Sequence, residues 1–238
     1  MPELSVIVPC YNEEKNLPFI IRGFDEIVRG LDVEVLLVNN GSTDNSAAVL
    51  EQQLSQLPHG QIKEIKVPVN KGYGFGILEG LNNASGNILS WTHADGQTDP
   101  ADVLRAWEKY KTYNDPLLVI KGQRKQRAFG PVFFTWAMQW MTNILLRTRL
   151  HDINAQPKLF SRIFYEQIAA NAPHDFSLDV YLLYHAYKKG RIETIPVVFK
   201  KRMYGEAKGG GGFKTRIKLI RRTFGYLFRL RNQLSGKA

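Results

Sequence analysis

Cysteine is almost absent from the sequence, and this absence narrows the class of protein. Cys10 is the one cysteine among 238 residues, so an intrachain disulfide framework is impossible and a cysteine-based zinc site is not expected. The first residues also lack a basic stretch followed by a long apolar segment, so we expect no cleaved secretion signal. Both observations predict a protein of the reducing cytoplasm.

Acidic residues are scarce near the C-terminus. Residues 188–238 hold 15 Lys or Arg but only two acidic residues, Glu193 and Glu206, whereas the whole chain has a formal net charge of +10. A basic C-terminal region indicates an anionic partner, either nucleic acid or an acidic lipid surface. No nucleic-acid recognition module accompanies the charge, so we expect lipid and no nucleic acid.

The pattern of the last thirty residues predicts how that charge is displayed. We predict a flexible hinge at the four glycines 209–212. After them, apolar residues recur at steps of three and four beside a face of Lys and Arg. The apolar stripe consists of Phe213, Ile217, Ile220, Phe224, Leu227 and Phe228. This is typical of a basic amphipathic helix lying on an anionic membrane surface. The alternative is a helix packed on the domain or against a membrane-protein partner.

A second stretch without charge covers residues 128–146. Its length approaches that of a membrane span, but polar residues interrupt it at helical spacing. Thr135, Gln139, Thr142 and Asn143 share one face, opposite Phe133, Trp136, Trp140, Met141 and Ile144. We predict an amphipathic helix that meets a membrane interface or a lipid groove, or else packs on the core.

The first 120 residues alternate between short β-branched runs and amphipathic stretches. We predict strands at 4–8, 33–38, 62–67, 88–91 and 117–120, and helices at 17–29, up to about 54, up to about 84, and from 100 to about 113. Such repeats predict an α/β fold with a mostly parallel sheet flanked by helices. Asn12-Glu13, Asn39-Asn40 and His93-Ala94-Asp95 follow successive strands, so they are expected together at one ligand-binding edge of the sheet.

Six motifs in this order resemble those of the family-2 glycosyltransferases of GT-A fold, particularly the polyprenyl-phosphate (dolichol-phosphate type) sugar transferases. They are Val6-Ile7-Val8-Pro9-Cys10-Tyr11-Asn12-Glu13-Glu14, Val38-Asn39-Asn40-Gly41-Ser42-Thr43-Asp44, Asn70-Lys71-Gly72 with Gly80 and Ala84-Ser85-Gly86, His93-Ala94-Asp95-Gly96-Gln97 with Asp99-Pro100, Gly122-Gln123-Arg124, and Arg202-Met203-Tyr204-Gly205-Glu206-Ala207-Lys208. The resemblance covers about residues 4–208. It implies a Rossmann-like GT-A domain at 1–208, with a nucleotide-sugar half at about 1–122 and an acceptor half at about 123–208, followed by the hinge and basic helix at 209–238.

The same resemblance implies a function and a set of residues. The function is metal-dependent, inverting transfer of a sugar from a nucleotide-sugar to a polyprenyl phosphate, by a protein held peripherally at the cytoplasmic membrane face. Asp95 and Gln97 would bind Mg²⁺ or Mn²⁺, which with Lys or Arg stabilises the departing diphosphate. The nucleotide would contact Pro9, Tyr11, Asn12, Glu13, Asn40, Lys71, Gly72, Ala94 and Asp95. The catalytic set would be Asp95, Arg124, Asp152, Arg202 and Lys208, with Arg124, Arg202 and Lys208 on the acceptor phosphate.

Two departures from the family pattern keep other functions open. Asn39-Asn40 stands where relatives usually have Asp-Asp, and His93 stands where they have an acid, so a non-catalytic nucleotide-sugar-binding protein is one alternative. A transferase with a soluble or glycan acceptor is another, and it would need a carboxylate base such as Asp152 or Asp179. The sequence is also compatible with a homo-oligomer.

Overall fold

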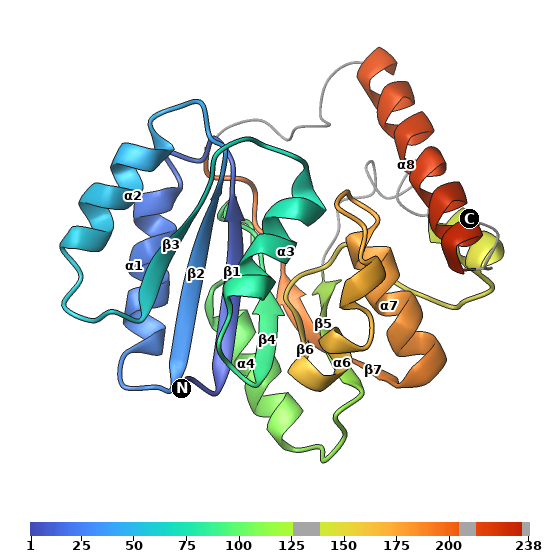
Figure 1. The fold of residues 1–238 in the computed structure, drawn as a ribbon, viewed down its shortest axis with the longest axis horizontal. Coiled ribbons are helices and arrows are strands. Elements are labelled where there is room, and N and C mark those ends of the chain that lie inside the picture. Colours follow the sequence, from blue (N-terminus) through green and yellow to red (C-terminus); the bar gives the residue numbers. More distant parts are fainter. Residues whose placement is uncertain (126–138, 205–212, 235–238) are drawn as a thin grey trace.

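The chain folds around a seven-stranded sheet (Figure 1). A computed structural model describes residues 1–125, 139–204 and 213–234, and for residues 213–223 it describes the backbone only. The strand order is β3-β2-β1-β4-β6-β5-β7. The strands are β1 Leu4–Cys10, β2 Val33–Asn40, β3 Ile62–Val67, β4 Ile88–Trp91, β5 Leu118–Lys125, β6 Lys158–Ser161 and β7 Arg191–Val198.

Six of these strands run in the same direction. The pairs β1–β2, β2–β3, β1–β4 and β5–β7 are parallel, whereas β6 lies antiparallel between β4 and β5. The predicted mostly parallel sheet is therefore confirmed. Because β6 runs backwards, the residues that precede it lie at the edge where the other strands end.

Helices cover both faces of the sheet, and alternate side chains of the strands supply two apolar cores. Val6 and Val8 of β1 face α1, α2 and α4, whereas Ile7 faces α3, α6 and α7. The helices are α1 Leu17–Val28, α2 Ser46–Ser55, α3 Tyr73–Asn83, α4 Ala101–Lys111, α6 Arg162–Glu166, α7 Leu178–Lys189 and α8 Phe213–Leu234, with a short 3₁₀ turn at Ala169–Asn171 and a helix at 139–146. Burying both faces explains why the strands are rich in Val, Ile and Leu.

Three strands extend beyond their predicted ends. Proline has no amide hydrogen for the strand ladder, so the sequence predicts that the first strand stops at Val8; the extended backbone instead continues to Cys10, which pairs with Asn39. Asn40 pairs with Val67 inside β2–β3. The strand predicted at 117–120 likewise continues through the motif at 122–124, because β7 pairs along β5 as far as Lys125.

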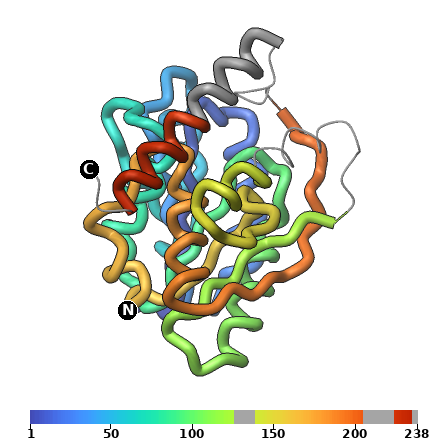
Figure 2. Tube along the Cα trace, turned by 90° about the vertical axis from the view of Figure 1, so that its right-hand side faces the viewer, coloured from blue at the N-terminus to red at the C-terminus, as the bar shows by residue number. Residues whose placement is uncertain are grey.

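The second half of α8 packs on the protein. Leu227 and Leu230 are each 2% exposed in the core that contains α7, and Gln233 Nε2 donates to the Asn171 carbonyl at 2.7 Å. Phe228, from the same predicted stripe, is exposed. The predicted apolar stripe is therefore not all on one surface. Leu227 packs on the domain, as in the alternative prediction, whereas Phe228 faces outward. In Figures 1 and 2, α8 lies alongside α7. The predicted hinge at 209–212 is outside the described residues.

Helix 139–146 is the described part of the helix predicted at 128–146. Its polar side faces the protein: Thr142 is 3% exposed, and Asn143 Oδ1 accepts hydrogen bonds from the Leu150 amide at 2.8 Å and the Thr148 hydroxyl at 3.0 Å. Trp140 and Ile144, one turn apart, are each 56% exposed. The helix therefore buries Leu146 in the core together with these polar side chains, and it leaves two large apolar side chains outside. Within the ranges that the structure describes, no helix has the length and apolarity to cross a membrane.

Candidate active site

The polar loops predicted to converge do meet at the carboxyl edge of the sheet. The loop after β1 bonds to the loop after β2, since Asn12 Oδ1 accepts from the Thr43 amide at 2.8 Å and Asn12 Nδ2 donates to Thr43 Oγ1 at 3.1 Å. Asn12 has a left-handed φ of 56°, which an asparagine tolerates better than most residues. Its side chain therefore fixes the two loops against each other. Pro9 lies in β1 and Tyr11 directly follows it.

Asn40 joins the end of β2 to the start of α3. Its Nδ2 donates to the Gly72 carbonyl at 2.9 Å, while its buried Oδ1 has no hydrogen-bond partner among the described residues. A Cβ added to Gly76 would lie 2.8 Å from Asn40 Nδ2. A glycine at position 76 therefore leaves room for the side-chain amide of Asn40. Asn39 has a structural role instead, since its Nδ2 donates to Glu64 Oε1 at 3.1 Å and its Oδ1 accepts from the Ser42 amide at 3.2 Å.

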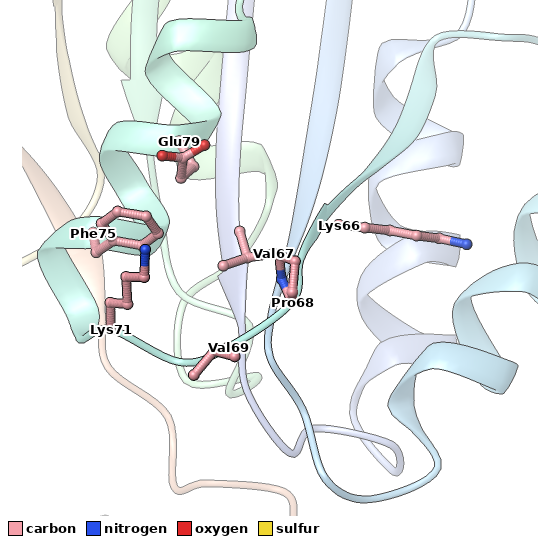
Figure 3. A pocket seen from close by; sticks show the side chains of 7 residues that line it. All are labelled: Lys66, Val67, Pro68, Val69, Lys71, Phe75 and Glu79. Carbon is pink, nitrogen blue, oxygen red and sulfur yellow. The ribbon is translucent and has the colours of Figure 1, made fainter.

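Lys71 and Gly72 open α3 at the same edge. Gly72 has a φ of 122°, a conformation that favours glycine, and an added Cβ would lie 2.8 Å from the His174 carbonyl. The Lys71 ammonium lies 5.0 Å from the centre of the Phe75 ring. Lys71 and Phe75 line a hollow of about 190 Å³ together with Glu79 and residues 66–69. The Lys66 side chain points away from this hollow (Figure 3).

Asp95 lies in the loop after β4 and faces a cation. Its Oδ1 accepts from the Gln97 amide at 3.1 Å, and Arg202 Nη2 donates to its Oδ2 at 3.3 Å. The same Nη2 is 3.7 Å from Glu13 Oε1, and both carboxylate side chains are only 10% exposed. Two carboxylates from separate loops therefore converge on one positive nitrogen. The side chain of Ala94 packs in the core, so only its backbone can face a ligand.

The donor set around Asp95 fits a divalent cation that also binds phosphate. No cluster of three or more His, Cys, Asp or Glu suited to a metal occurs in the described ranges. Mg²⁺ and similar hard ions need only one or two carboxylates when substrate phosphates and water complete the shell. Asp95 and Gln97 would supply such oxygens, with Gln97 Nε2 already donating to the Lys200 carbonyl at 3.1 Å. Burial lowers the pKa of His93, although Asp95 and Asp179 oppose that shift.

Arg124 and Asp152 are paired on the acceptor side. The Arg124 amide donates to Asp152 Oδ2 at 2.7 Å, and its Nε and Nη2 both donate to Oδ1, the former at 2.8 Å. The Asp152 amide in turn donates to Gln139 Oε1 at 2.8 Å, so helix 139–146 is attached directly to this pair. Lys208 lies outside the described residues. Arg202, predicted on the acceptor phosphate, lies against Asp95 and Glu13.

Two buried lysines beneath this edge were missed by sequence reasoning. Lys158 is fully buried, and its Nζ donates to Asp179 Oδ1 at 2.9 Å. Lys121 is 4% exposed, and its Nζ donates to the Asp152 carbonyl at 3.2 Å. Burial lowers the pKa of both, that of Lys121 to about 7. The one available signal was their position beside short apolar runs, since Lys121 follows residues 117–120 and Lys158 precedes Leu159-Phe160.

The Lys158–Asp179 pair also holds a third polar side chain. Gln156 Nε2 donates to Asp179 Oδ1 at 3.0 Å and lies 3.4 Å from the Tyr73 hydroxyl. Burial alone would raise the pKa of Asp179, but the charge and hydrogen bond of Lys158 lower it. Asp179 therefore serves a buried network behind the acceptor side.

The sheet topology and the cation-holding carboxylates at its edge define an enzyme of the GT-A class. The chain belongs to glycosyl transferase family 2, whose sequence pattern matches residues 5–169, and it is a glycosyltransferase. Glucosyl-3-phosphoglycerate synthase from Mycobacterium tuberculosis, solved with Mn²⁺, UDP and glucosyl-3-phosphoglycerate, has a similar structure with a TM-score of 0.72 at 17% identity, covering 100% of this chain and 81% of that chain. Mannosyltransferase PcManGT from Pyrobaculum calidifontis, solved with GDP-Man and Mn²⁺, gives 0.66 at 19%, covering 96% and 64%. At these identities the likeness concerns the fold.

Proposed function

We propose that the protein transfers a glycosyl group from a nucleotide-sugar to a polyprenyl phosphate, using Mg²⁺ or Mn²⁺, at the cytoplasmic face of a membrane. The donor half of the proposal is supported by the two carboxylates, Asp95 and Glu13, that converge on a cationic nitrogen. The two similar structures were solved with Mn²⁺ and with UDP or GDP-Man. A metal ion bound there would neutralise charge that grows on the diphosphate as the glycosidic bond breaks.

Asn40 supports a choice of nucleotide base. Because its Nδ2 is bonded to the Gly72 carbonyl, the Oδ1 is the side-chain atom that lacks a described partner. It is buried, so the loop must move for a base to reach it, and an amide oxygen accepts hydrogen bonds only. Uracil and guanine present a ring N–H to such an acceptor. Adenine and cytosine present ring nitrogens without hydrogen at the corresponding edge. We therefore propose a uridine or guanosine diphosphate sugar as donor.

The acceptor half of the proposal needs a group that is already nucleophilic. Both carboxylate oxygens of Asp152 accept hydrogen bonds from Arg124, and Asp179 is bonded to Lys158 and Gln156. Neither carboxylate is well placed to take a proton from a sugar hydroxyl. An acceptor phosphate oxygen is an anion and needs no such base. Arg124 would orient it through Nη1, because its Nε and Nη2 already donate to Asp152 and hydrogen bonds from a guanidinium to phosphate are strong.

The exposed apolar side chains of helix 139–146 carry the lipid part of the proposal. Gln139 holds the backbone of Asp152 while Trp140 and Ile144 are directed outward, so an exposed apolar surface is attached directly to the Arg124–Asp152 pair. Arg147 and Arg149 are exposed just after the helix. Tryptophan with flanking cations is typical of an anionic membrane interface. Figure 2 shows this helix, in yellow, on the same side of the molecule as α8.

The acceptor is tested by offering three compounds in one assay. Purified protein with Mn²⁺ and UDP- or GDP-sugars receives a short-chain polyprenyl phosphate, 3-phosphoglycerate or a free saccharide. We expect transfer to the polyprenyl phosphate. Asp95→Asn should reduce it at least about 100-fold, a loss comparable with that of other electrostatic catalytic groups. Asp99→Asn, in the same loop but half exposed, should retain it. Transfer only to phosphoglycerate or saccharide would refute the lipid acceptor, and an active Asp95→Asn would refute the metal role.

The membrane surface has its own test. Trp140→Gln with Ile144→Gln should weaken binding to anionic liposomes at least about tenfold, because two large apolar side chains no longer enter the interface. Leu31→Gln with Ile163→Gln removes two other exposed apolar side chains, which lie at the opposite edge of the sheet, and should leave binding unchanged. Equal loss in both double variants would show that no particular surface meets the lipid.

A further inference from the structure

The segment after β7 crosses the donor side of the molecule, and we call residues 199–204 the strap. It is bonded to the loop after β4, where the Lys200 amide donates to the Gln97 carbonyl at 2.9 Å and Gln97 Nε2 donates back to the Lys200 carbonyl at 3.1 Å. It is also attached to the start of α1: Asn16 Nδ2 donates to the Tyr204 carbonyl at 3.4 Å, and the Tyr204 and Phe19 rings stack at 5.9 Å. The strap therefore joins the two loops that carry Asp95 and Glu13.

Arg202 is the strap residue that enters the site. Its Nη2 lies 3.3 Å from Asp95 Oδ2 and 3.7 Å from Glu13 Oε1, and its side chain is 21% exposed. Two carboxylates so little exposed would repel each other without a positive charge between them. Met203, the next residue, packs against the loop after β4, since a Cβ added to Gly96 would lie 3.2 Å from its sulfur.

We propose that Arg202 is a built-in cation that holds Asp95 until the metal ion and the donor exchange it. The proposal rests on the metal role proposed for Asp95. A divalent ion binds a carboxylate oxygen at about 2 Å. An ion bound to Asp95 Oδ2 would therefore lie close to the Arg202 guanidinium and repel it, so the two cations cannot both bind that oxygen. The freed guanidinium then has a new anion at hand, because the donor diphosphate arrives with the ion and a guanidinium binds phosphate well.

This exchange has a thermodynamic consequence. Metal alone must displace Arg202 from Asp95 without replacing that contact, whereas metal together with a nucleoside diphosphate supplies a new anionic group for the guanidinium. Each ligand therefore raises the affinity for the other, and by linkage the coupling is the same in both directions. Arg202 thereby favours joint binding of metal and donor over binding of the metal alone.

The test measures Mn²⁺ binding directly, from the loss of the free-Mn²⁺ electron paramagnetic resonance signal without nucleotide. We expect Arg202→Gln to bind Mn²⁺ about tenfold more tightly than the wild type, as for one partly buried charge pair. Lys200→Gln is the matched control: it removes a positive charge from the same strap, but one that lies 3.8 Å from Asp99. It should change the affinity less than about twofold. Adding UDP or GDP should then raise Mn²⁺ affinity by a larger factor in the wild type than in Arg202→Gln.

The outcomes separate this inference from the proposed function. Unchanged or weaker Mn²⁺ binding by Arg202→Gln, with binding lost in Asp95→Asn, overturns the exchange and leaves the metal role of Asp95 in place. Wild-type affinity in Asp95→Asn overturns both, as does the absence of Mn²⁺ binding in every protein. A thermal melt checks the fold of each variant. If Arg202→Gln does not fold, Arg202→Lys replaces it. Its Mn²⁺ affinity should then lie between that of Lys200→Gln and the tenfold higher affinity expected for Arg202→Gln.

Discussion

Lys158 and Asp179 form an ion pair that is closed off from solvent, with Nζ 2.9 Å from Oδ1 and side chains 0% and 5% exposed. The pair connects the first residue of β6 to the first turn of α7. Removing one member leaves the other charge buried and uncompensated. We expect Lys158→Met to lower the free energy of unfolding by about 3–5 kcal/mol, measured by urea denaturation.

Two comparisons decide whether burial causes that loss. Lys158→Met combined with Asp179→Leu should recover most of the stability, because no unpaired charge remains. Lys111→Met breaks the exposed pair with Glu108 and should cost at most about 1 kcal/mol. A Lys158→Met variant no less stable than Lys111→Met would contradict the assignment.

Lys121 predicts a pH dependence of stability. Burial is the main cause that lowers its pKa from 10.5 to about 7, with the nearby charge of Lys158 adding to the shift. Between these two pH values the unfolded chain binds the proton and the folded chain does not, so stability rises with pH. From pH 7 to pH 8.5 the wild type should gain about 2 kcal/mol relative to Lys121→Met. Denaturation curves at both pH values measure this, and a constant difference between the two proteins would refute it.

Asn40 predicts the selectivity for the nucleotide. By calorimetry, the wild type should bind UDP or GDP more tightly than ADP or CDP, and Asn40→Ala should lose about tenfold in affinity for the preferred nucleotide, the usual loss for one buried hydrogen bond. Asn83→Ala removes a side-chain bond to a carbonyl of the same kind, to Glu79 at 2.8 Å, but on an exposed helix end. It should leave affinity unchanged. Preference for ADP in the wild type would exclude the proposed contact.

Local pattern was enough to predict the strands and helices of the first half and the polar loops that meet at the sheet edge. Ile62–Val67 and Ile88–Trp91 are strands with the predicted bounds. The pattern of apolar residues and the turn-forming residues that flank each segment are local properties of the sequence, so they suffice for such a prediction. The antiparallel insertion of β6 between β4 and β5 has no such signal. It is decided by the packing of distant segments.

The contacts of the candidate site also depend on residues that are far apart in the sequence. Arg202 was identified by its motif, but a motif gives the residue type and not its neighbours, and the carboxylate it contacts is 107 positions away. Lys158 and Lys121 each stand at the end of an apolar run, as surface lysines also do. Their burial depends on Asp179 and on the Asp152 carbonyl, which come from other elements. Long-range electrostatic pairing could therefore not be predicted from the sequence.

The basic face of α8 predicts lipid binding that has to be separated from stability. Removing residues 209–238 would also remove Leu227 and Leu230 from the core, so we expect that truncation to lower the free energy of unfolding by about 3 kcal/mol or more. Loss of liposome binding by the truncated protein would then be ambiguous. A variant that keeps the helix and removes four of its seven positive charges is sharper. It carries Lys214→Gln, Lys218→Gln, Arg221→Gln and Arg222→Gln.

This four-charge variant should melt at the wild-type temperature but bind anionic vesicles about 1,000-fold more weakly, because each cation near such a surface contributes about 1 kcal/mol. Neutral vesicles should show no difference. The matched control removes four exposed charges from elements other than α8: Arg22→Gln, Lys63→Gln, Lys66→Gln and Lys111→Gln. If this control weakens vesicle binding equally, net charge alone holds the protein at the membrane and α8 has no special part. If only the α8 variant weakens it, the helix meets the lipid with its basic face while Leu227 stays in the protein core.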